Sequence, residues 1–247
     1  RCAHCRAEAE DRHYEEMSTG EVIPVIDAIA ARYRPILVLT GGEPLYREDL
    51  FEIAAHAKAK GLVIALATNG TLIDEAVAGR IRGAGFDRVS ISIDGADAAS
   101  HDGFRGIDGS FDRALRGAAF LREAGVPFQF NMTITKRNVG QLAGVLALAE
   151  ERGAKALHVF VLVPVGCGVE IAESDMLSPL ECEQALEWLC ERSRETAVEF
   201  KATCAPQYYR IIRQKAKAGG KTLTFESDGL AAVTRGCLAG TGVCFIS

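Results

Sequence analysis

Short runs of apolar, mostly β-branched residues recur along the chain, and between them apolar positions repeat every three or four residues. The first pattern is typical of buried strands and the second of amphipathic helices. The alternation indicates right-handed βαβ units and a parallel sheet. The predicted strands are ILVL (36–39), LVIAL (62–66), RVSISI (88–93), FQFNMTIT (128–135) and ALHVFVLV (156–163).

Two of the intervening segments have a clear helical repeat, EDLFEIAAHAKAKG (48–61) and SFDRALRGAAFLREAG (110–125). In the second, we expect Ser110 to be the N-cap and Gly125 to end the helix. After about residue 176 the rhythm changes to a long amphipathic helix (178–195), the strand-like VEFKAT and a glycine-rich end with two cysteines. We therefore expect a partial barrel over 1–176 and a smaller region over 177–247.

Composition and charge exclude several classes of protein. Hydrophobic residues at 48% and charged residues at 25% are ordinary for a soluble globular protein. A net charge of −5 argues against a nucleic-acid surface, which needs clustered Lys and Arg. The longest nearly apolar run, 156–169, is shorter than the roughly 18 residues of a membrane-spanning helix, so we expect no membrane span.

The chain has eight cysteines, which four disulfides would use up in a secreted protein. An acidic α/β chain with clustered cysteines is more often a cytoplasmic metal or redox protein, and we expect that location. Cys182 and Cys190 fall within the helical pattern 178–195, where small buried thiols are expected. The other six lie in loops or motifs.

Candidate chemistry gathers at the ends of the predicted strands, where parallel α/β sheets place their sites. TGGEP (40–44), ATNG (67–70), SIDG (92–95) and PVGCG (164–168) follow successive strands, and Asn131 and Thr133 lie within another. Each motif alone is typical of a turn. Together with the C-x-x-C of RCAHC (1–5), they indicate a single site. Zinc is the usual alternative for C-x-x-C, but the sequence has no second such pair.

This combination resembles the radical S-adenosylmethionine (SAM) superfamily, whose signature is C-x3-C-x2-C after the first barrel strand. Cys2 and Cys5 match the last two cysteines, and the resemblance places the first cysteine and the opening strand upstream of Arg1. It implies an α/β fold with a partial (βα)6 TIM-like barrel. It also implies a [4Fe-4S] cluster on these cysteines, with one iron left open for SAM.

The resemblance also implies roles in SAM binding. His4 takes the place of an aromatic residue near the adenine, Val163 or its neighbours contact the adenine through the backbone, and Arg105 meets the SAM carboxylate. Asn69 is a further candidate lining residue. The residues implied for the SAM amino group are Gly41, Gly42, Glu43 and Pro44, and those implied for the ribose are Ser92, Asp94 and Asn131.

The segments KATCAPQYYRI (201–211) and TRGCLAGTGVCFIS (234–247) resemble the tetrapyrrole-modifying branch, above all heme synthases that decarboxylate two propionates of Fe-coproporphyrin III. Similar too are didecarboxysiroheme deacetylases and denitrification-heme maturases. The cysteine-bearing end resembles the start of a SPASM extension, which implies an auxiliary iron–sulfur cluster on Cys237 and Cys244, with Cys204 a ligand or a buried thiol. An electron donor such as ferredoxin or flavodoxin is implied. The candidate substrate residues are Tyr208, Tyr209, Arg210 and Arg235.

Two positions depart from the pattern of this branch. Where many relatives have VPTGRG and CAPHYYR, this chain has Cys167 and Gln207, which favours the deacetylase-type relatives. A peptide-modifying SPASM enzyme is the next alternative, because such enzymes carry the same extension. An iron–sulfur electron carrier would need no SAM site, and a plain phosphate-binding barrel would leave Cys2 and Cys5 without a role.

Overall fold

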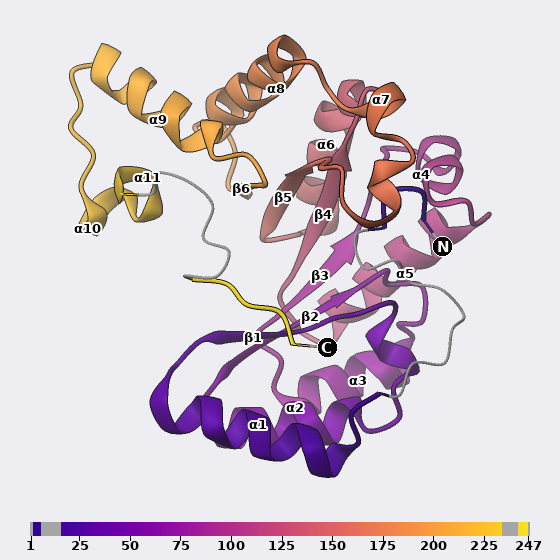
Figure 1. The fold of residues 1–247 in the computed structure, drawn as a ribbon. Coiled ribbons are helices and arrows are strands. Elements are labelled where there is room, and N and C mark those ends of the chain that lie inside the picture. The colour runs from indigo at the N-terminus through magenta and orange to yellow at the C-terminus, as the bar shows by residue number, and fades with distance from the viewer. Residues whose placement is uncertain (1, 6–15, 234–241, 247) are drawn as a thin grey trace.

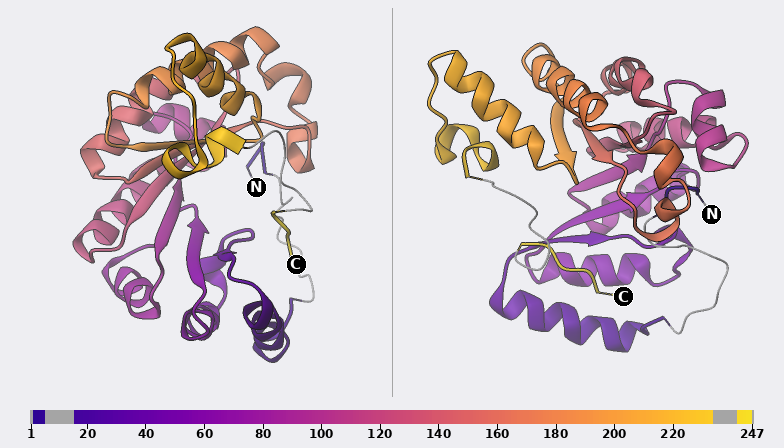
Figure 2. Two further views of the ribbon diagram at one scale, coloured as in Figure 1. Left: turned by 90° about the vertical axis from the view of Figure 1, so that its left-hand side faces the viewer. Right: turned by 45° about the horizontal axis from the view of Figure 1, so that its top comes forward.

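The computed structural model describes residues 2–5, 16–233 and 242–246. Six parallel strands form one sheet in the order β1-β2-β3-β4-β5-β6, so each strand pairs with its neighbour in sequence. The strands are β1 (Ile36–Leu39), β2 (Val63–Thr68), β3 (Arg88–Ser92), β4 (Phe128–Ile134), β5 (Ala156–Val161) and β6 (Glu199–Thr203). The sheet curls into an open half-barrel, which confirms the predicted fold class (Figure 2, left).

Helices cover the convex side of the sheet (Figure 1). The first six are α1 (Thr19–Arg32), α2 (Leu50–Ala59), α3 (Glu75–Ala84), α4 (Ala98–Arg105), α5 (Ser110–Glu123) and α6 (Leu142–Arg152). The later ones are α7 (Ala172–Asp175), α8 (Pro179–Arg192), α9 (Gln207–Ala218), α10 (Phe225–Asp228) and α11 (Leu230–Val233). Short 3₁₀ turns occur at Pro44–Tyr46, Val139–Gln141 and Gly166–Val169.

The core lies between the sheet and these helices. Alternate residues of each strand face it, and on β4 these are Phe128, Phe130, Met132 and Ile134, all at most 2% exposed. The residues between them therefore face the concave side. Burying apolar area at roughly 25 cal/mol per Å² makes this layer the main source of stability. Cys182 and Cys190 pack into the same core, as predicted.

The last strand joins the same sheet as the other five. β6 pairs in parallel with β5 from Glu199 to Thr203, so the sheet continues past the expected boundary at residue 176. VEFKAT is a single short run after a helix, and nothing local shows which sheet it joins. The division into two regions remains a prediction.

The start of α5 also differs from the expected capping. Ser110 is the first helical residue, and Gly109 occupies the N-cap position with φ 70°. The Asp102 carboxylate of α4 accepts hydrogen bonds from the backbone N–H groups of Gly109 and Phe111 and from the Ser110 hydroxyl, at 2.6–2.8 Å. A side chain from the preceding helix thus satisfies the free N–H groups.

Candidate active site

The described N-terminal residues form a tight turn that carries the two motif cysteines. The Cys5 N–H donates to the Cys2 carbonyl at 3.1 Å, and both side chains are partly buried. Burial raises the pKa of the Cys2 thiol, and the nearby Arg105 works in the opposite direction. Two thiols on one turn, one of them beside a cation, are a donor set that suits an iron–sulfur cluster.

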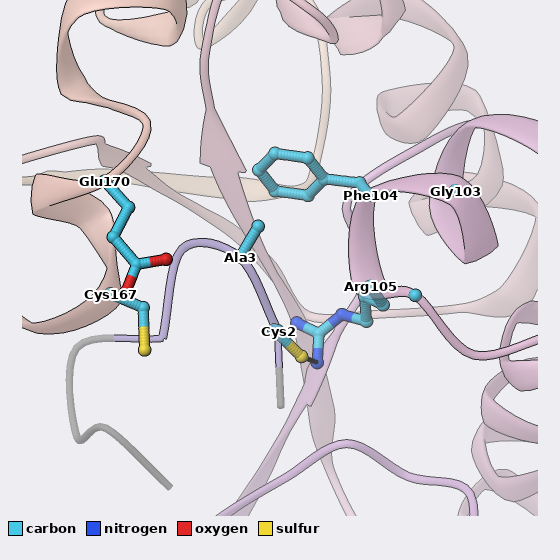
Figure 3. A pocket seen from close by; sticks show the side chains of 8 residues that line it. Cys2, Ala3, Gly103, Phe104, Arg105, Cys167 and Glu170 are labelled. Atoms are coloured by element: carbon cyan, nitrogen blue, oxygen red, sulfur yellow. Dashed lines mark hydrogen bonds between the residues drawn. The ribbon is translucent and has the colours of Figure 1, made fainter.

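A buried ion pair lies directly beside this turn. Asp94, 1% exposed at the end of β3, receives both Nε and Nη2 of Arg105 on its Oδ2, each at 2.8 Å. The third guanidinium nitrogen, Nη1, lies 3.9 Å from the Cys2 Sγ (Figure 3). The Thr133 N–H donates to Asp94 Oδ1 at 2.8 Å. Burial opposes the charge on Asp94, but Arg105 and His4 outweigh it and lower the pKa of this carboxyl.

His4 links the turn to the same pair. Its ring stacks on Phe104 with centroids 4.4 Å apart, and its Nε2 lies 3.5 Å from Asp94 Oδ2. Its Nδ1 is buried without a hydrogen-bond partner among the described residues. Buried polar atoms are rarely left so, and this nitrogen suits a ligand that brings a partner for it. The adenine role of His4 remains a prediction.

Glu43 ties the ends of β1 and β2 together. Its carboxylate accepts from the Thr68 hydroxyl at 2.7 Å, the Asn69 N–H at 2.8 Å and the Leu45 N–H at 3.2 Å. Burial raises the pKa of Glu43, against the effect of these hydrogen bonds. Glu43 therefore shapes the loop, with Gly41 and Gly42 exposed and Pro44 buried beside it. That the loop's carbonyls meet the SAM amino group remains a prediction.

The other predicted SAM residues lie nearby but make internal contacts. The Asn69 amide oxygen accepts from the Thr71 N–H at 2.8 Å, which closes an Asx turn. Asn131 lies opposite Ser92 in the β3–β4 register and accepts from the Gln129 amide at 2.9 Å. Val163 is partly buried just after β5. Their roles toward SAM remain predictions.

A cavity of about 290 Å³ opens beside the cysteine turn (Figure 3). The Cys167 N–H donates to the Cys5 carbonyl at 3.0 Å, so the PVGCG segment packs directly against the turn. Cys167 itself is buried, 1% exposed. The lining residues are Cys2, Ala3, Gly103, Phe104, Arg105, Gly106, Cys167 and Glu170.

The residues predicted for substrate contact mostly make packing contacts. Tyr208 is 4% exposed in the hydrophobic core, where burial raises its pKa to about 12, and its ring tilts against that of Tyr209. Arg210 pairs with Glu183 of α8. Arg235 lies outside the described residues. Tyr208 lies on the buried side of α9.

The structure describes two of the three candidate ligands of an auxiliary cluster. Cys204 is exposed, with φ 58°, and Cys244 is exposed, whereas Cys237 lies outside the described residues. Among the described cysteines, Cys2, Cys182, Cys190, Cys204 and Cys244 form no disulfide. Within the described ranges, no three His, Cys, Asp or Glu side chains form a group that could hold a metal ion.

Sequence reasoning did not identify His101, which lies under the site. It is 1% exposed, and its Nδ1 accepts from the Asp94 N–H at 3.1 Å. Burial, followed by the charge of Arg105, lowers the pKa of His101 to about 4. The motif HDGFRG does not show whether its histidine is buried beneath the site or lies on the surface.

We expect the stability of the protein to fall as the pH drops from about 6.5 to 4. The pKa of His101 is about 4 in the folded protein and roughly 6.5 in the unfolded chain. The unfolded chain therefore binds the proton more tightly, and acid favours it. At pH 5 this amounts to about 2 kcal/mol. Urea unfolding at pH 7.5 and 5.0 should show that His101→Asn loses about 2 kcal/mol less than wild type. Equal losses in the two proteins would contradict the shift.

Comparison with known proteins identifies the class to which this site belongs. The sequence profile of the Radical SAM superfamily matches residues 1–149, and the chain belongs to that superfamily. Enzymes of this family use a [4Fe-4S] cluster and SAM. Among solved structures, SuiB of Streptococcus suis bound to the precursor peptide SuiA has the same fold, with a TM-score of 0.72 over 85% of this chain and 48% of that one, at 15% identity.

Individual relatives indicate which enzymes of the superfamily this chain is similar to. An AdoMet-dependent heme synthase of Methanosarcina barkeri is 47% identical over all 247 residues, which cover 70% of that protein. A Fe-coproporphyrin III synthase of the same organism is 38% identical over 196 residues, or 79% of this chain and 49% of that protein.

In the described part of the chain, no helix is long and apolar enough to cross a membrane.

Proposed function

We propose that this chain is the radical SAM part of a heme-biosynthesis enzyme that oxidatively decarboxylates the propionates of Fe-coproporphyrin III to vinyl groups. The observation that carries the proposal is the 47% identity to an AdoMet-dependent heme synthase over the whole chain. The match to a Fe-coproporphyrin III synthase of the same organism is weaker and leaves a fifth of this chain unaligned.

In this function Cys2 and Cys5 hold the [4Fe-4S] cluster with a third cysteine. When bound and reduced, the cluster would supply the electron that cleaves SAM into methionine and a 5′-deoxyadenosyl radical able to abstract hydrogen from a propionate. Arg105 keeps positive charge beside Cys2, which favours the thiolate that iron requires. Asp94 fixes Arg105 in place through two of its three guanidinium nitrogens.

Decarboxylation leaves one electron to be removed from the substrate. Cys237 and Cys244 would be among the ligands of an auxiliary iron–sulfur cluster, which would supply the electron acceptor. Ferredoxin or flavodoxin would reduce the first cluster. We place the enzyme in the cytoplasm, a reducing compartment in which cysteines stay available to bind iron.

The second candidate is a deacetylase-type enzyme of the same pathway. Cys167 and Gln207 stand where many relatives have Arg and His, and Gln207 is exposed at the first position of α9. If that His is needed for decarboxylation, the exchange favours a different reaction on a related tetrapyrrole. The fold shared with SuiB, which was solved bound to a precursor peptide, supports a peptide substrate as a further alternative.

The test uses the full-length gene product, expressed anaerobically and reconstituted with iron and sulfide. We expect dithionite-dependent formation of 5′-deoxyadenosine from SAM in the presence of Fe-coproporphyrin III, with loss of two carboxyl groups by mass spectrometry. Deoxyadenosine without a change in the porphyrin would overturn the decarboxylase and favour the deacetylase. No deoxyadenosine from a cluster-loaded protein would point to an electron carrier.

A further inference from the structure

The concave face of the sheet carries a row of polar side chains. The register places Ser92 opposite Asn131, Asn131 opposite His158, and His158 opposite Lys201. We call these four residues the polar row. Neighbouring strands lie about 4.8 Å apart, so the row runs about 14 Å from Ser92 on β3 to Lys201 on β6.

An ion pair spans the concave face next to this row. Arg88 on β3 reaches Glu199 on β6 at 3.3 Å, across two intervening strands, which is possible because both side chains point inward from a curved sheet. Lys201 lies two residues beyond Glu199 and therefore on the same face. It is exposed, and it makes no ion pair with any residue in the ranges 2–5, 16–233 and 242–246.

The neighbour of Lys201 in the row does not neutralise it. His158 Nδ1 lies 2.8 Å from the Gln129 amide nitrogen. Burial, then the charges of Lys201 and Arg88, lower the pKa of His158 to about 4, so the ring is neutral at physiological pH. Glu199 is the one carboxylate on this stretch of β6, and Arg88 holds it. This end of the row is thus positive.

The other side of the same face is apolar. Ile36, Val38 and Val63, on β1 and β2, are 65%, 49% and 47% exposed. Their register places them on the concave side with Ala65 and Arg88. An exposed apolar area on the same face of the sheet as a cation complements a flat apolar molecule that carries carboxylates.

We propose that Lys201 binds a substrate carboxylate, namely a propionate other than the one that reacts. The inference rests on the proposed function, because the tetrapyrrole carries several propionates. Ser92 and Asn131, at the opposite end of the row, are the residues predicted for the SAM ribose. The row therefore spans from the reacting propionate beside SAM to a second propionate on Lys201.

The experiment is a porphyrin titration of the full-length, cluster-loaded protein, monitored by the Soret absorbance. We expect Lys201→Gln to raise the Kd for Fe-coproporphyrin III about tenfold or more, because a charge-assisted hydrogen bond is lost. Lys201→Arg should restore binding. Lys217→Gln, on the exposed side of α9, is the matched control and should bind as wild type does. The esterified porphyrin should bind equally to wild type and Lys201→Gln.

The other outcomes overturn the inference, the proposed function or both. An equal loss of affinity for acid and ester would show that Lys201 acts through packing. Unchanged affinity with a lower thermal midpoint would show that it pairs with an acidic group of the chain itself. Failure of the wild type to decarboxylate the porphyrin, with binding intact, would refute the proposed function instead; failure of the wild type to bind it would refute both.

Discussion

Replacement of Cys2 by serine is expected to abolish SAM cleavage and leave the barrel folded. A serine hydroxyl stays protonated at neutral pH and does not replace a thiolate as an iron ligand. Cys2 lies on an N-terminal turn outside the hydrophobic core, so the sheet should keep its stability. The measurements are iron and sulfide content after reconstitution, the electron paramagnetic resonance signal of the reduced cluster, and 5′-deoxyadenosine by chromatography.

Cys182→Ser is the matched control for this variant. Cys182 is 8% exposed within α8 and packs into the core, so its hydroxyl replacement should cost about 1–3 kcal/mol of stability without loss of the cluster. A Cys2→Ser protein that binds a full cluster and cleaves SAM at the wild-type rate would exclude Cys2 from the ligand set. The two serine variants together separate a cluster role from a general effect of losing a thiol.

The strands could be predicted from the sequence because each is a short β-branched run between breakers. ILVL (36–39) coincides with β1, and the other four predictions differ from β2 to β5 by at most two residues at an end. β6 could not be assigned, because its partner β5 lies about 40 residues upstream and only the curvature of the sheet brings the two together. The prediction of the α5 N-cap was wrong for a similar reason, since the capping residue Asp102 belongs to another helix.

At the site, the sequence indicated which residues gather but not how they pair. Asp94 and Arg105 were predicted as separate contacts to SAM, and the structure joins them to each other. Motif spacing places both at strand or helix ends near the cluster turn, but pairing depends on the direction of α4 relative to β3. Of the polar row, the sequence indicated Ser92 and Asn131 but not His158 or Lys201. His158 is a single polar residue inside an apolar strand, and only the register places it beside Asn131.

Removal of the Arg105 side chain should therefore damage both stability and the cluster. Arg105→Ala leaves Asp94, 1% exposed, with an uncompensated charge, and breaking a buried pair in this way costs about 3–5 kcal/mol. The loss should appear as a lower urea midpoint with an unchanged m-value in the cluster-free, full-length protein. In the same cluster-free protein, the Cys2 thiol should lose its neighbouring cation and its pKa should rise, because burial then acts without opposition from Arg105, so less thiolate is available to bind iron during reconstitution.

The double variant Arg105→Ala, Asp94→Asn tests whether the pair is the cause. Asparagine keeps an acceptor for the Thr133 N–H and removes the stranded charge, so the double variant should regain part of the lost stability. His4, whose Nε2 lies 3.5 Å from Asp94 Oδ2, provides a second test of the ion pair. In Arg105→Ala its protonation should compensate Asp94, so the stability deficit should shrink as the pH falls toward 5. A deficit independent of pH and unchanged in the double variant would show that Arg105 stabilises the fold through its packing.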